Sequence, residues 1–223
     1  MEIMFKHLNL EIRKDPKEGS EWLWPIEDTW CWHHLNKVRF RNLPKKIAEY
    51  CKERNLVIQA GGNAGYYPKQ YSKLFNTVIT FEPDHRNFYC LSYNVPEENV
   101  FKFRACIGND NTPLSLELHK DHDLNLGGLR IAGEGIIPQV KIDHFGLNPS
   151  LIHLDIEGFE GFALLGAEET VKRSKPVIVL EINGFGDAYG WSKEKINELL
   201  VSWNYIEHMT FESDTMYIHK DFV

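Results

Sequence analysis

The stretch Val57-Ile-Gln-Ala-Gly-Gly-Asn-Ala-Gly65 decides the fold of this chain. A short apolar run breaks there into a glycine-rich turn, and a helical pattern follows. Gly61 and Gly65 can adopt backbone angles that a Cβ atom disfavours, so the turn can fold tightly and offer bare backbone to a ligand. We therefore predict a nucleoside-binding turn between a strand and a helix. The plainer interpretation is a turn whose glycines serve backbone geometry alone.

Strands and helices alternate along the rest of the chain. Apolar runs predict strands at 56–58, 77–81, 100–104, 140–142, 151–156 and 176–182. Helical spacing predicts a helix that begins at Leu43, with Pro44 in its first turn, and further helices at 66–74, 85–93, 160–172 and 191–203. Residues 108–135 are predicted to be loop-rich, and 205–211 with 215–219 to form a hairpin. This order predicts an α/β fold: a doubly wound, mainly parallel Rossmann-like sheet with a C-terminal antiparallel hairpin.

Residues 1–42 lack clean periodicity and hold four of the six tryptophans: Trp22, Trp24, Trp30 and Trp32. We predict an N-terminal aromatic appendage at 1–42 and one ligand-binding domain at 43–223. The appendage is either a lid that offers stacking faces to a substrate or an aromatic plug that covers the sheet. The plug is the favoured interpretation.

Composition excludes several classes of protein. A chain of 223 residues with 43% hydrophobic and 26% charged residues is typical of one globular domain. The formal net charge of −7 disfavours a nucleic-acid partner. The four cysteines form no Cys-x-x-Cys pair, so we expect no zinc ribbon or disulfide framework, and a reducing cytoplasm. No apolar window approaches the roughly 18 residues of a membrane span, which predicts a soluble protein without a membrane partner.

The identity of the nucleoside follows from the residues around the turn. A dinucleotide-binding fingerprint that starts at Gly61 needs glycine where this chain has Asn63 and Tyr66, so NAD is disfavoured. Glu82 follows the second strand about 20 residues after the turn, where a carboxylate can accept hydrogen bonds from ribose. Gly61, Glu82 and Asp155 should meet at the carboxyl edge of the sheet. A ribose carboxylate without a pyrophosphate cradle suits S-adenosylmethionine.

Six motifs in this order resemble the FkbM-type methyltransferases, a family of class I, S-adenosylmethionine-dependent enzymes. They are Val57–Gly65, Phe81-Glu-Pro-Asp84, Val140-Lys-Ile-Asp143, Leu151-Ile-His-Leu-Asp-Ile-Glu-Gly-Phe-Glu160, Leu165-Gly-Ala167 and Val179-Leu-Glu-Ile182. The resemblance covers residues 55–183, and Asp155-x-Glu-Gly-x-Glu160 is its most specific part. It implies the class I methyltransferase fold and O-methylation of sugar or natural-product hydroxyls.

The resemblance also implies a set of cofactor-binding residues. They are Gln59, Gly61, Gly62, Asn63, Gly65, Glu82, Pro83, Ala105, Cys106 and Asp155, with Ala105 and Cys106 beside the adenine. The family usually has an acidic residue where this chain has Gln59. An amide there can orient water or the amino group of the ligand, but it supplies no charge. The family also commonly has a lysine in place of His153.

Asp155, Glu157 and Glu160 place three carboxylates close together at a strand end. Such groups repel one another unless a cation, an arginine or hydrogen bonds relieve them. The sulfonium, a substrate hydroxyl and a divalent metal are the candidates. We predict no metal, because a glutamate at the start of a helix is already favoured by the helix dipole. Asp143 and Glu181 end neighbouring strands and either line the same cleft or are simple charges at its rim.

Methyl transfer to a hydroxyl needs the acceptor oxygen held behind the methyl carbon, and a positioned base helps to remove the proton. The candidate catalytic residues are Asp155, His122 and His153. The plainer interpretation of His122 is a solvated loop residue, and that of His153 is a packed, hydrogen-bonded strand residue. The candidate substrate-binding residues are Glu157, Trp24, Trp30 and Asn125.

The sequence therefore predicts an S-adenosylmethionine-dependent O-methyltransferase that acts on a hydroxyl of a carbohydrate or a glycosylated small molecule. A second hypothesis is a non-catalytic module that binds S-adenosylmethionine or another nucleoside, because Gln59 removes a charge. A third and weaker hypothesis is a nucleic-acid methyltransferase.

Overall fold

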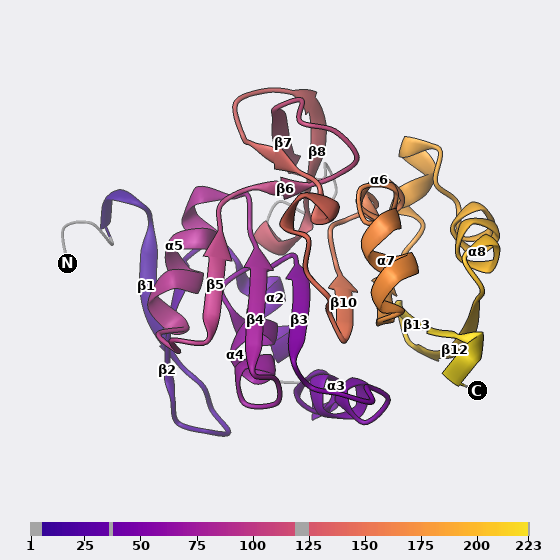
Figure 1. The fold of residues 1–223 in the computed structure, drawn as a ribbon. Helices are drawn as coiled ribbons and strands as arrows, with labels where there is room; N and C mark the ends of the chain where they lie inside the picture. The colour runs from indigo at the N-terminus through magenta and orange to yellow at the C-terminus, as the bar shows by residue number, and fades with distance from the viewer. Residues whose placement is uncertain (1–5, 36–37, 119–124, 223) are drawn as a thin grey trace.

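The computed structural model describes residues 6–35, 38–118 and 125–222. Its centre is a seven-stranded sheet with the order β12-β13-β11-β10-β3-β4-β5 (Figure 1). Five strands of this sheet pair in parallel: β3 (Leu56–Ala60), β4 (Thr77–Phe81), β5 (Val100–Phe103), β10 (Leu151–Leu154) and β11 (Val177–Glu181). The hairpin of β12 (Tyr205–Phe211) and β13 (Asp214–His219) adds the antiparallel edge. The predicted doubly wound sheet is confirmed.

Helices cover both faces of this sheet because successive side chains of each strand point to opposite sides. On one face, Ile58 and Ile152 pack against α6 (Glu160–Leu165), α7 (Glu168–Ser174) and α8 (Lys193–Ser202). On the other face, Val57 and Leu151 pack against α3 (Val38–Ala48), α4 (Tyr66–Ser72) and α5 (His85–Asn94). Each fully buried aliphatic side chain contributes about 1.5–3 kcal/mol relative to an exposed one. The two apolar cores therefore hold the sheet between its helices.

Three local predictions are wrong. The helix predicted from Leu43 begins at Val38, so Pro44 lies inside α3 and removes one internal hydrogen bond instead of occupying the first turn. The segment 108–135, predicted to be loop-rich, contains two strands that pair antiparallel, β7 (Leu114–Leu118) and β8 (Leu129–Glu134). The predicted strand at 140–142 is only β9 (Gln139–Val140), which pairs with β6 (Cys106–Ile107) before a short 3₁₀ helix, η2 (Ile142–Phe145).

The described part of the N-terminal region packs closely on the sheet domain. It forms an antiparallel hairpin, β1 (Leu10–Lys14) and β2 (Glu21–Pro25), followed by α2 (Thr29–Leu35). Leu23 and Trp24 are fully buried, and the side-chain amide of Asn94 on α5 donates to the carbonyl oxygens of Leu23 and Ala64. The burial of Trp24 agrees with the interpretation of the N-terminal region as a plug that covers the sheet. Trp30, in contrast, is 47% exposed.

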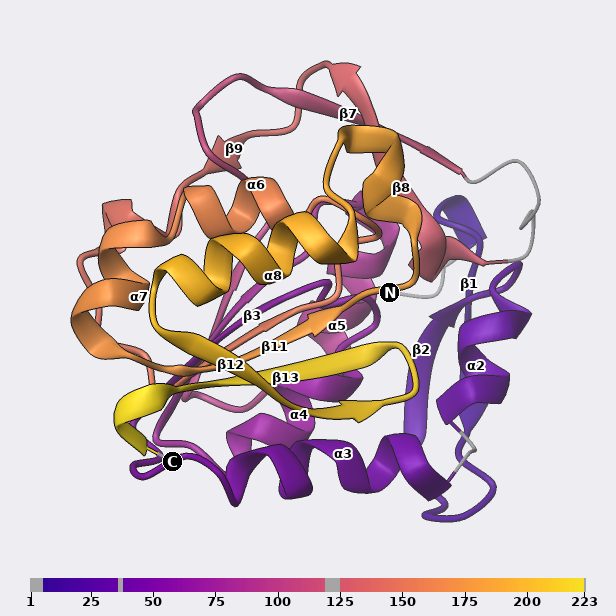
Figure 2. The same cartoon turned by 90° about the vertical axis from the view of Figure 1, so that its right-hand side faces the viewer.

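The fold brings distant segments to one edge of the sheet. Figure 1 shows β3, β4 and β5 pointing toward the side that carries the β7–β8 hairpin. Figure 2 shows the turn between β12 and β13 on the same side of the view as β2 and α2, and Glu212 and Ser213 of this turn line one pocket together with Trp24 and Trp30. Within the described residues, none of the helices combines the length and the apolar character needed to cross a membrane.

Candidate functional site

The glycine turn after β3 lies directly against Asp155. Gly61 has a φ of +84°, and a Cβ atom there would lie 1.8 Å from the carbonyl oxygen of Asp155. The N–H groups of Gly61 and Gly62 both donate to the carbonyl oxygen of Phe81, at 3.1 and 2.9 Å. The turn therefore joins the ends of β3, β4 and β10, as the sequence predicts. Only glycine fits at position 61, because both its φ and its contact with Asp155 exclude a side chain.

Two residues assigned to the cofactor have structural roles instead. The side-chain amide of Gln59 is fully buried and donates to the carbonyl oxygens of Ala60 and Gly61, at 3.0 and 2.9 Å. A carboxylate could not donate to these groups, so glutamine suits a position that holds the turn from behind. Gly65, with a φ of +103°, begins α4, and a Cβ atom there would lie 2.5 Å from Val95. Neither residue lines the pockets described below.

Glu82 ends β4 and joins the glycine turn to the next helix. Its Oε2 atom accepts a hydrogen bond of 2.7 Å from the N–H of Asn63, and its Oε1 atom accepts one of 2.8 Å from the N–H of Asp84. The side chain is 5% exposed, and this burial raises its pKa to about 8. Each carboxylate oxygen has two lone pairs, so each can accept a second hydrogen bond from a ligand. Glu82 is therefore both fixed in orientation and able to bind hydroxyl groups.

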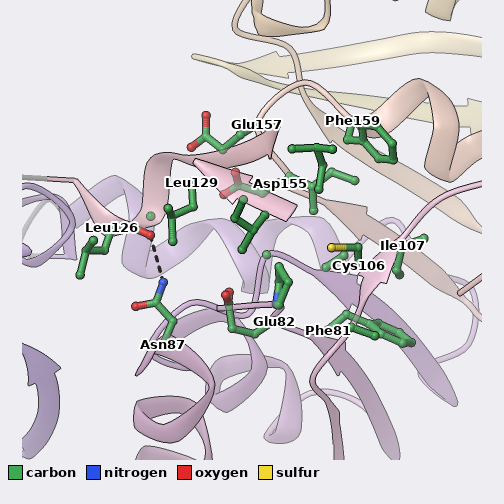
Figure 3. A pocket seen from close by; sticks show the side chains of 18 residues that line it. Phe81, Glu82, Asn87, Cys106, Ile107, Leu126, Leu129, Asp155, Glu157 and Phe159 are labelled. Carbon is green, nitrogen blue, oxygen red and sulfur yellow. Dashed lines mark hydrogen bonds between the residues drawn. The ribbon is translucent and has the colours of Figure 1, made fainter. Parts of the chain in front are cut away.

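A first cavity, the apolar pocket, opens beside Glu82 and has a volume of about 530 Å³ including space open to solvent (Figure 3). Pro83, Ala105 and Cys106, three of the residues predicted to bind the cofactor, line it. The sequence did not identify its other apolar walls, which come from β6, η1 (Leu126–Gly128), β7, β8 and the start of α6: Ile107, Leu116, Leu126, Leu129, Ile131 and Phe159. Such walls suit the flat, largely apolar face of a nucleobase.

A second cavity, the aromatic pocket, adjoins the first and has a volume of about 1040 Å³ including space open to solvent. Its walls come from the N-terminal region, the glycine turn, the strand ends and the β12–β13 turn: Trp24, Trp30, Cys31, Leu35, Gly62, Asn63, Ala64, Tyr66, Tyr67, Asn125, Glu181, Glu212 and Ser213. The two pockets share Gly61, Glu82, Gly127, Asp155 and Glu157. The predicted substrate residues Trp24, Trp30, Asn125 and Glu157 are therefore brought together.

Asp155, Glu157 and Glu181 form an acidic cluster where the pockets meet. One carboxylate oxygen of each lies within 4.8 Å of those of the other two. Asn183 donates to Glu181 at 2.9 Å and to Glu157 at 3.4 Å. Oxygen ligands at this spacing could hold a divalent cation. Shared protons and hydrogen bonds are the other way to relieve the repulsion.

The three carboxyl groups of the acidic cluster have different pKa values. Burial and the charge of Asp214 raise the pKa of Asp155 to about 6. Burial and the charge of Asp155 raise the pKa of Glu157 to about 8, and the same causes raise the pKa of Glu181 well above its ordinary value. A hydrogen bond with Glu181 lowers the pKa of Asp155, which opposes these effects. The raised pKa of Glu181 favours its protonated form near neutral pH, and in that form it can donate a hydrogen bond to Asp155.

Two predicted neighbours of the cluster lie elsewhere. Glu160 is 2% exposed, and its Oε1 atom accepts a hydrogen bond of 2.9 Å from the N–H of Ile156. Glu160 therefore stabilises the turn after β10. The third member of the acidic cluster is Glu181, where the sequence had predicted Glu160. Asp143 accepts hydrogen bonds from the N–H groups of Glu169 and Thr170 at the start of α7, so it stabilises that helix rather than lining the cleft.

His153 lies inside the sheet, outside both pockets. Its Nδ1 atom is 2.8 Å from the hydroxyl of Tyr71, and its Nε2 atom is 3.5 Å from Asp214. Side chains alternate along a strand, so His153 and Leu154 face opposite sides, and the chain reaches the cleft only at Asp155. His153 is therefore a packed strand residue, which corrects its prediction as a base. His122 lies outside the described residues.

The buried acidic groups predict how stability depends on pH. Glu82, Glu157, Glu160 and Asp155 have raised pKa values of about 8, 8, 7 and 6 in the folded chain. Between their unfolded and folded pKa values, the folded state binds more protons than the unfolded state, so the free energy of unfolding falls as pH rises. We expect the melting temperature of the ligand-free protein to fall between about pH 5 and pH 8.

Calorimetry over this pH range measures whether the melting temperature falls as pH rises. Glu157→Gln should flatten the fall, because it removes one of the titrating groups. Glu198→Gln, on the exposed side of α8, is the matched control and should leave the pH dependence unchanged. A melting temperature that rises over the range would contradict the expected protonation of these groups.

Comparisons with known proteins agree with the fold. The profile of the methyltransferase FkbM domain matches residues 59–211. The structure of methyltransferase FkbM from Methylobacillus flagellatus KT is similar, with a TM-score of 0.51 and 19% identity over 75% of this chain and 44% of that chain. This chain thus spans less than half of that protein's length.

A second similar structure is magnesium protoporphyrin IX methyltransferase from Synechocystis PCC 6803 with bound S-adenosylmethionine. Its TM-score is 0.51, with 9% identity over 86% of this chain and 85% of that chain. No curated protein matches the sequence significantly. At these identities the structural similarities show the fold alone. Because the family profile covers more than half of the residues, this chain belongs to the FkbM methyltransferase family.

Proposed function

We propose that this protein is an S-adenosylmethionine-dependent O-methyltransferase that acts on a hydroxyl of a carbohydrate or a glycosylated small molecule. The observation that carries the proposal is the meeting of two pockets at Gly61, Glu82 and Asp155. One pocket has apolar walls that suit an adenine, and the other combines aromatic and acidic side chains that suit a polyhydroxylated acceptor. The family match and a structure of the same fold with bound S-adenosylmethionine support this cofactor.

The residues present fit the cofactor. Glu82 would accept hydrogen bonds from the ribose hydroxyls, because its carboxylate is held by two backbone N–H groups and faces both pockets. Ala105 and Cys106 would pack beside the adenine, and the turn from Gly61 to Asn63 would hold the methionine portion. When bound, S-adenosylmethionine supplies an electrophilic methyl carbon for an in-line displacement.

Asp155 is the base that the geometry favours. It belongs to both pockets, so it lies where the cofactor and the acceptor meet. Its pKa of about 6 leaves it ionised near neutral pH, and a protonated Glu181 would donate a hydrogen bond that holds it in place. Asp155 would accept the proton of the acceptor hydroxyl as the oxygen attacks, while the apolar walls exclude water.

We further propose that this chemistry needs no metal. The acidic cluster already gains relief from the protonated form that the raised pKa of Glu181 favours and from the amide of Asn183. The non-catalytic alternative loses its main support, because Gln59 holds the glycine turn and does not line either pocket.

Labelled methyl transfer tests the proposed function. The protein is incubated with S-adenosylmethionine labelled in its methyl group and with a fractionated extract of glycans and metabolites, with and without EDTA. We expect label in a glycan or glycoside fraction, as an alkali-stable ether, to the same extent in both conditions. Thermal stabilisation by S-adenosylhomocysteine, which should grow with ligand concentration, confirms folded protein and cofactor binding. Binding without transfer to any fraction would contradict the enzyme assignment.

A further inference from the structure

The backbone N–H groups of the glycine turn all donate to oxygen atoms of the protein itself. The groups that do so belong to Gly61, Gly62, Asn63, Ala64 and Gly65. The N–H of Ala64, for example, donates to the side-chain oxygen of Asn63 at 2.6 Å, and the N–H of Gly65 donates to the carbonyl oxygen of Gly62 at 2.8 Å. No N–H group of these residues is left for an anionic group of a ligand. A carboxylate bound beside the turn therefore needs donors from another part of the chain.

The proposed function places such a carboxylate beside the turn. The methionine portion of S-adenosylmethionine, and the corresponding portion of S-adenosylhomocysteine, carries one ammonium group and one carboxylate. The ammonium group is a donor, so it suits the carbonyl oxygens of the turn and the carboxylate of Asp155. The carboxylate of the ligand is only an acceptor, and binding it without donors would cost the hydrogen bonds that it makes with water.

Asn125, directly before η1, carries an amide that can serve as this donor. The side chain is 8% exposed. Its Oδ1 atom accepts a hydrogen bond of 3.0 Å from the N–H of Gly128 and one of 3.1 Å from the thiol of Cys31 on α2. Because the amide group is planar, these two bonds also fix the direction of its Nδ2 atom.

The Nδ2 atom of Asn125 is an unused donor. None of the described residues accepts a hydrogen bond from it, and it is not one of the buried atoms that lack a partner, so solvent reaches it. Buried amides normally satisfy their donors inside the protein. An amide that is fixed through its oxygen and open at its nitrogen is therefore arranged to bind a ligand.

The position of Asn125 matches the methionine end of the cofactor. Asn125 lines the aromatic pocket but not the apolar pocket, which is the one that suits the adenine. Its neighbour Gly127 packs against the turn, since a Cβ atom there would lie 2.8 Å from the Nδ2 atom of Asn63 and 2.4 Å from the sulfur of Cys31. Glu82, assigned to the ribose, lies where the two pockets meet. The part of the ligand that extends beyond the ribose into the aromatic pocket is thus the part nearest to Asn125.

We propose that the side-chain amide of Asn125 donates a hydrogen bond to the carboxylate of the methionine portion of the cofactor. This inference rests on the proposed function and adds to it a residue that recognises the amino-acid end of the ligand. The sequence predicts Asn125 as a substrate-binding residue, and this proposal assigns it to the cofactor instead.

The test removes the carboxylate from the ligand and the donor from the protein, one at a time and together. Isothermal titration calorimetry compares S-adenosylhomocysteine with its decarboxylated analogue, 5′-S-(3-aminopropyl)-5′-thioadenosine, in the wild-type protein and in Asn125→Asp. Aspartate keeps an acceptor oxygen for Gly128 and Cys31 but replaces the NH₂ group with a second oxygen. The pH is about 7.5, where an aspartate is ordinarily ionised.

We expect Asn125→Asp to bind S-adenosylhomocysteine at least about tenfold more weakly than the wild-type protein does, because a hydrogen bond to a charged group is lost. The variant should bind the decarboxylated analogue as well as the wild-type protein does, or better. The wild-type protein gives a second measurement that needs no variant: it should bind the analogue at least about tenfold more weakly than S-adenosylhomocysteine.

Asn76→Asp is the matched control. Asn76 is exposed, directly precedes β4 at the opposite edge of the sheet and lines neither pocket. The substitution changes the net charge equally and should leave both affinities unchanged. The melting temperature of each ligand-free variant shows whether it is folded.

The outcomes separate this inference from the function on which it rests. Equal weakening of both ligands by Asn125→Asp would indicate a structural role and overturn the inference. Equal affinity of the wild-type protein for the two ligands would also overturn it, as would a variant with unchanged affinity for S-adenosylhomocysteine and a raised KM for the acceptor. If the wild-type protein binds no S-adenosylhomocysteine, the proposed cofactor itself is wrong.

Discussion

Glu82→Gln should weaken the binding of S-adenosylhomocysteine about 100-fold at about pH 8.5, where the wild-type carboxyl is mostly ionised. The substitution removes the charge and replaces one acceptor oxygen with an amide that can only donate. A hydrogen bond to a charged group contributes about 1.5–3 kcal/mol, so the loss of one or two such bonds from ribose accounts for the effect. Isothermal titration calorimetry gives the dissociation constant directly.

Glu82 also binds the backbone N–H groups of Asn63 and Asp84, so the variant must first be shown to fold. The ligand-free melting temperature provides that check, and Glu198→Gln provides the matched control. A second measurement needs no variant: S-adenosylhomocysteine without its ribose 2′-hydroxyl should bind the wild-type protein about tenfold more weakly. Unchanged affinity in both measurements would contradict the assignment of Glu82 to the ribose.

The central sheet could be predicted because its parallel strands are buried on both faces and read as continuous apolar runs. The run from Leu56 to Ile58 and the run from Val177 to Leu180 are of this kind. The β7–β8 hairpin could not be predicted in the same way. Its strands are largely exposed, and Gly133 with Gly135 breaks the alternation of apolar and polar residues.

The site residues that could be predicted are those that directly follow a strand of the sheet. Gly61, Glu82 and Asp155 each follow a strand of the same parallel sheet, so topology alone places them together. Leu129 and Glu212 reach the pockets through turns that are distant in sequence, and no local pattern reveals such contacts. Tyr66 and Tyr67 are different, because they directly follow the glycine turn and could have been proposed from that position.

Asp155 and His153 show how closely related positions differ in role. Both belong to the segment Leu151–Glu160, and they are two residues apart. His153 is paired in the sheet with Gln59, so its ring is confined between the strand and Tyr71. Asp155 lies one residue beyond the end of β10, where the backbone leaves the sheet and the carboxylate can turn into the cleft. Of these two residues, therefore, only Asp155 can reach an acceptor.

Asp155→Asn is expected to lower kcat by about 10²- to 10⁴-fold, the usual contribution of a positioned general base, while S-adenosylhomocysteine still binds. Asparagine preserves the size of the side chain but cannot take up the proton. In the wild-type protein, kcat/KM should rise with pH through about 6 and then level off, because Asp155 is active in its ionised form. Asp187→Asn, on an exposed turn outside both pockets, is the matched control.

His122→Asn separates the remaining candidate base from Asp155, because a histidine would produce a similar rise of rate with pH. If Asp155 is the base, then His122→Asn keeps most of the activity and the same pH profile. If His122→Asn loses activity and Asp155→Asn retains it, the assignment of Asp155 is wrong. Glu181→Gln should retain more activity than Asp155→Asn, because an amide can donate a hydrogen bond to Asp155 as a protonated Glu181 would.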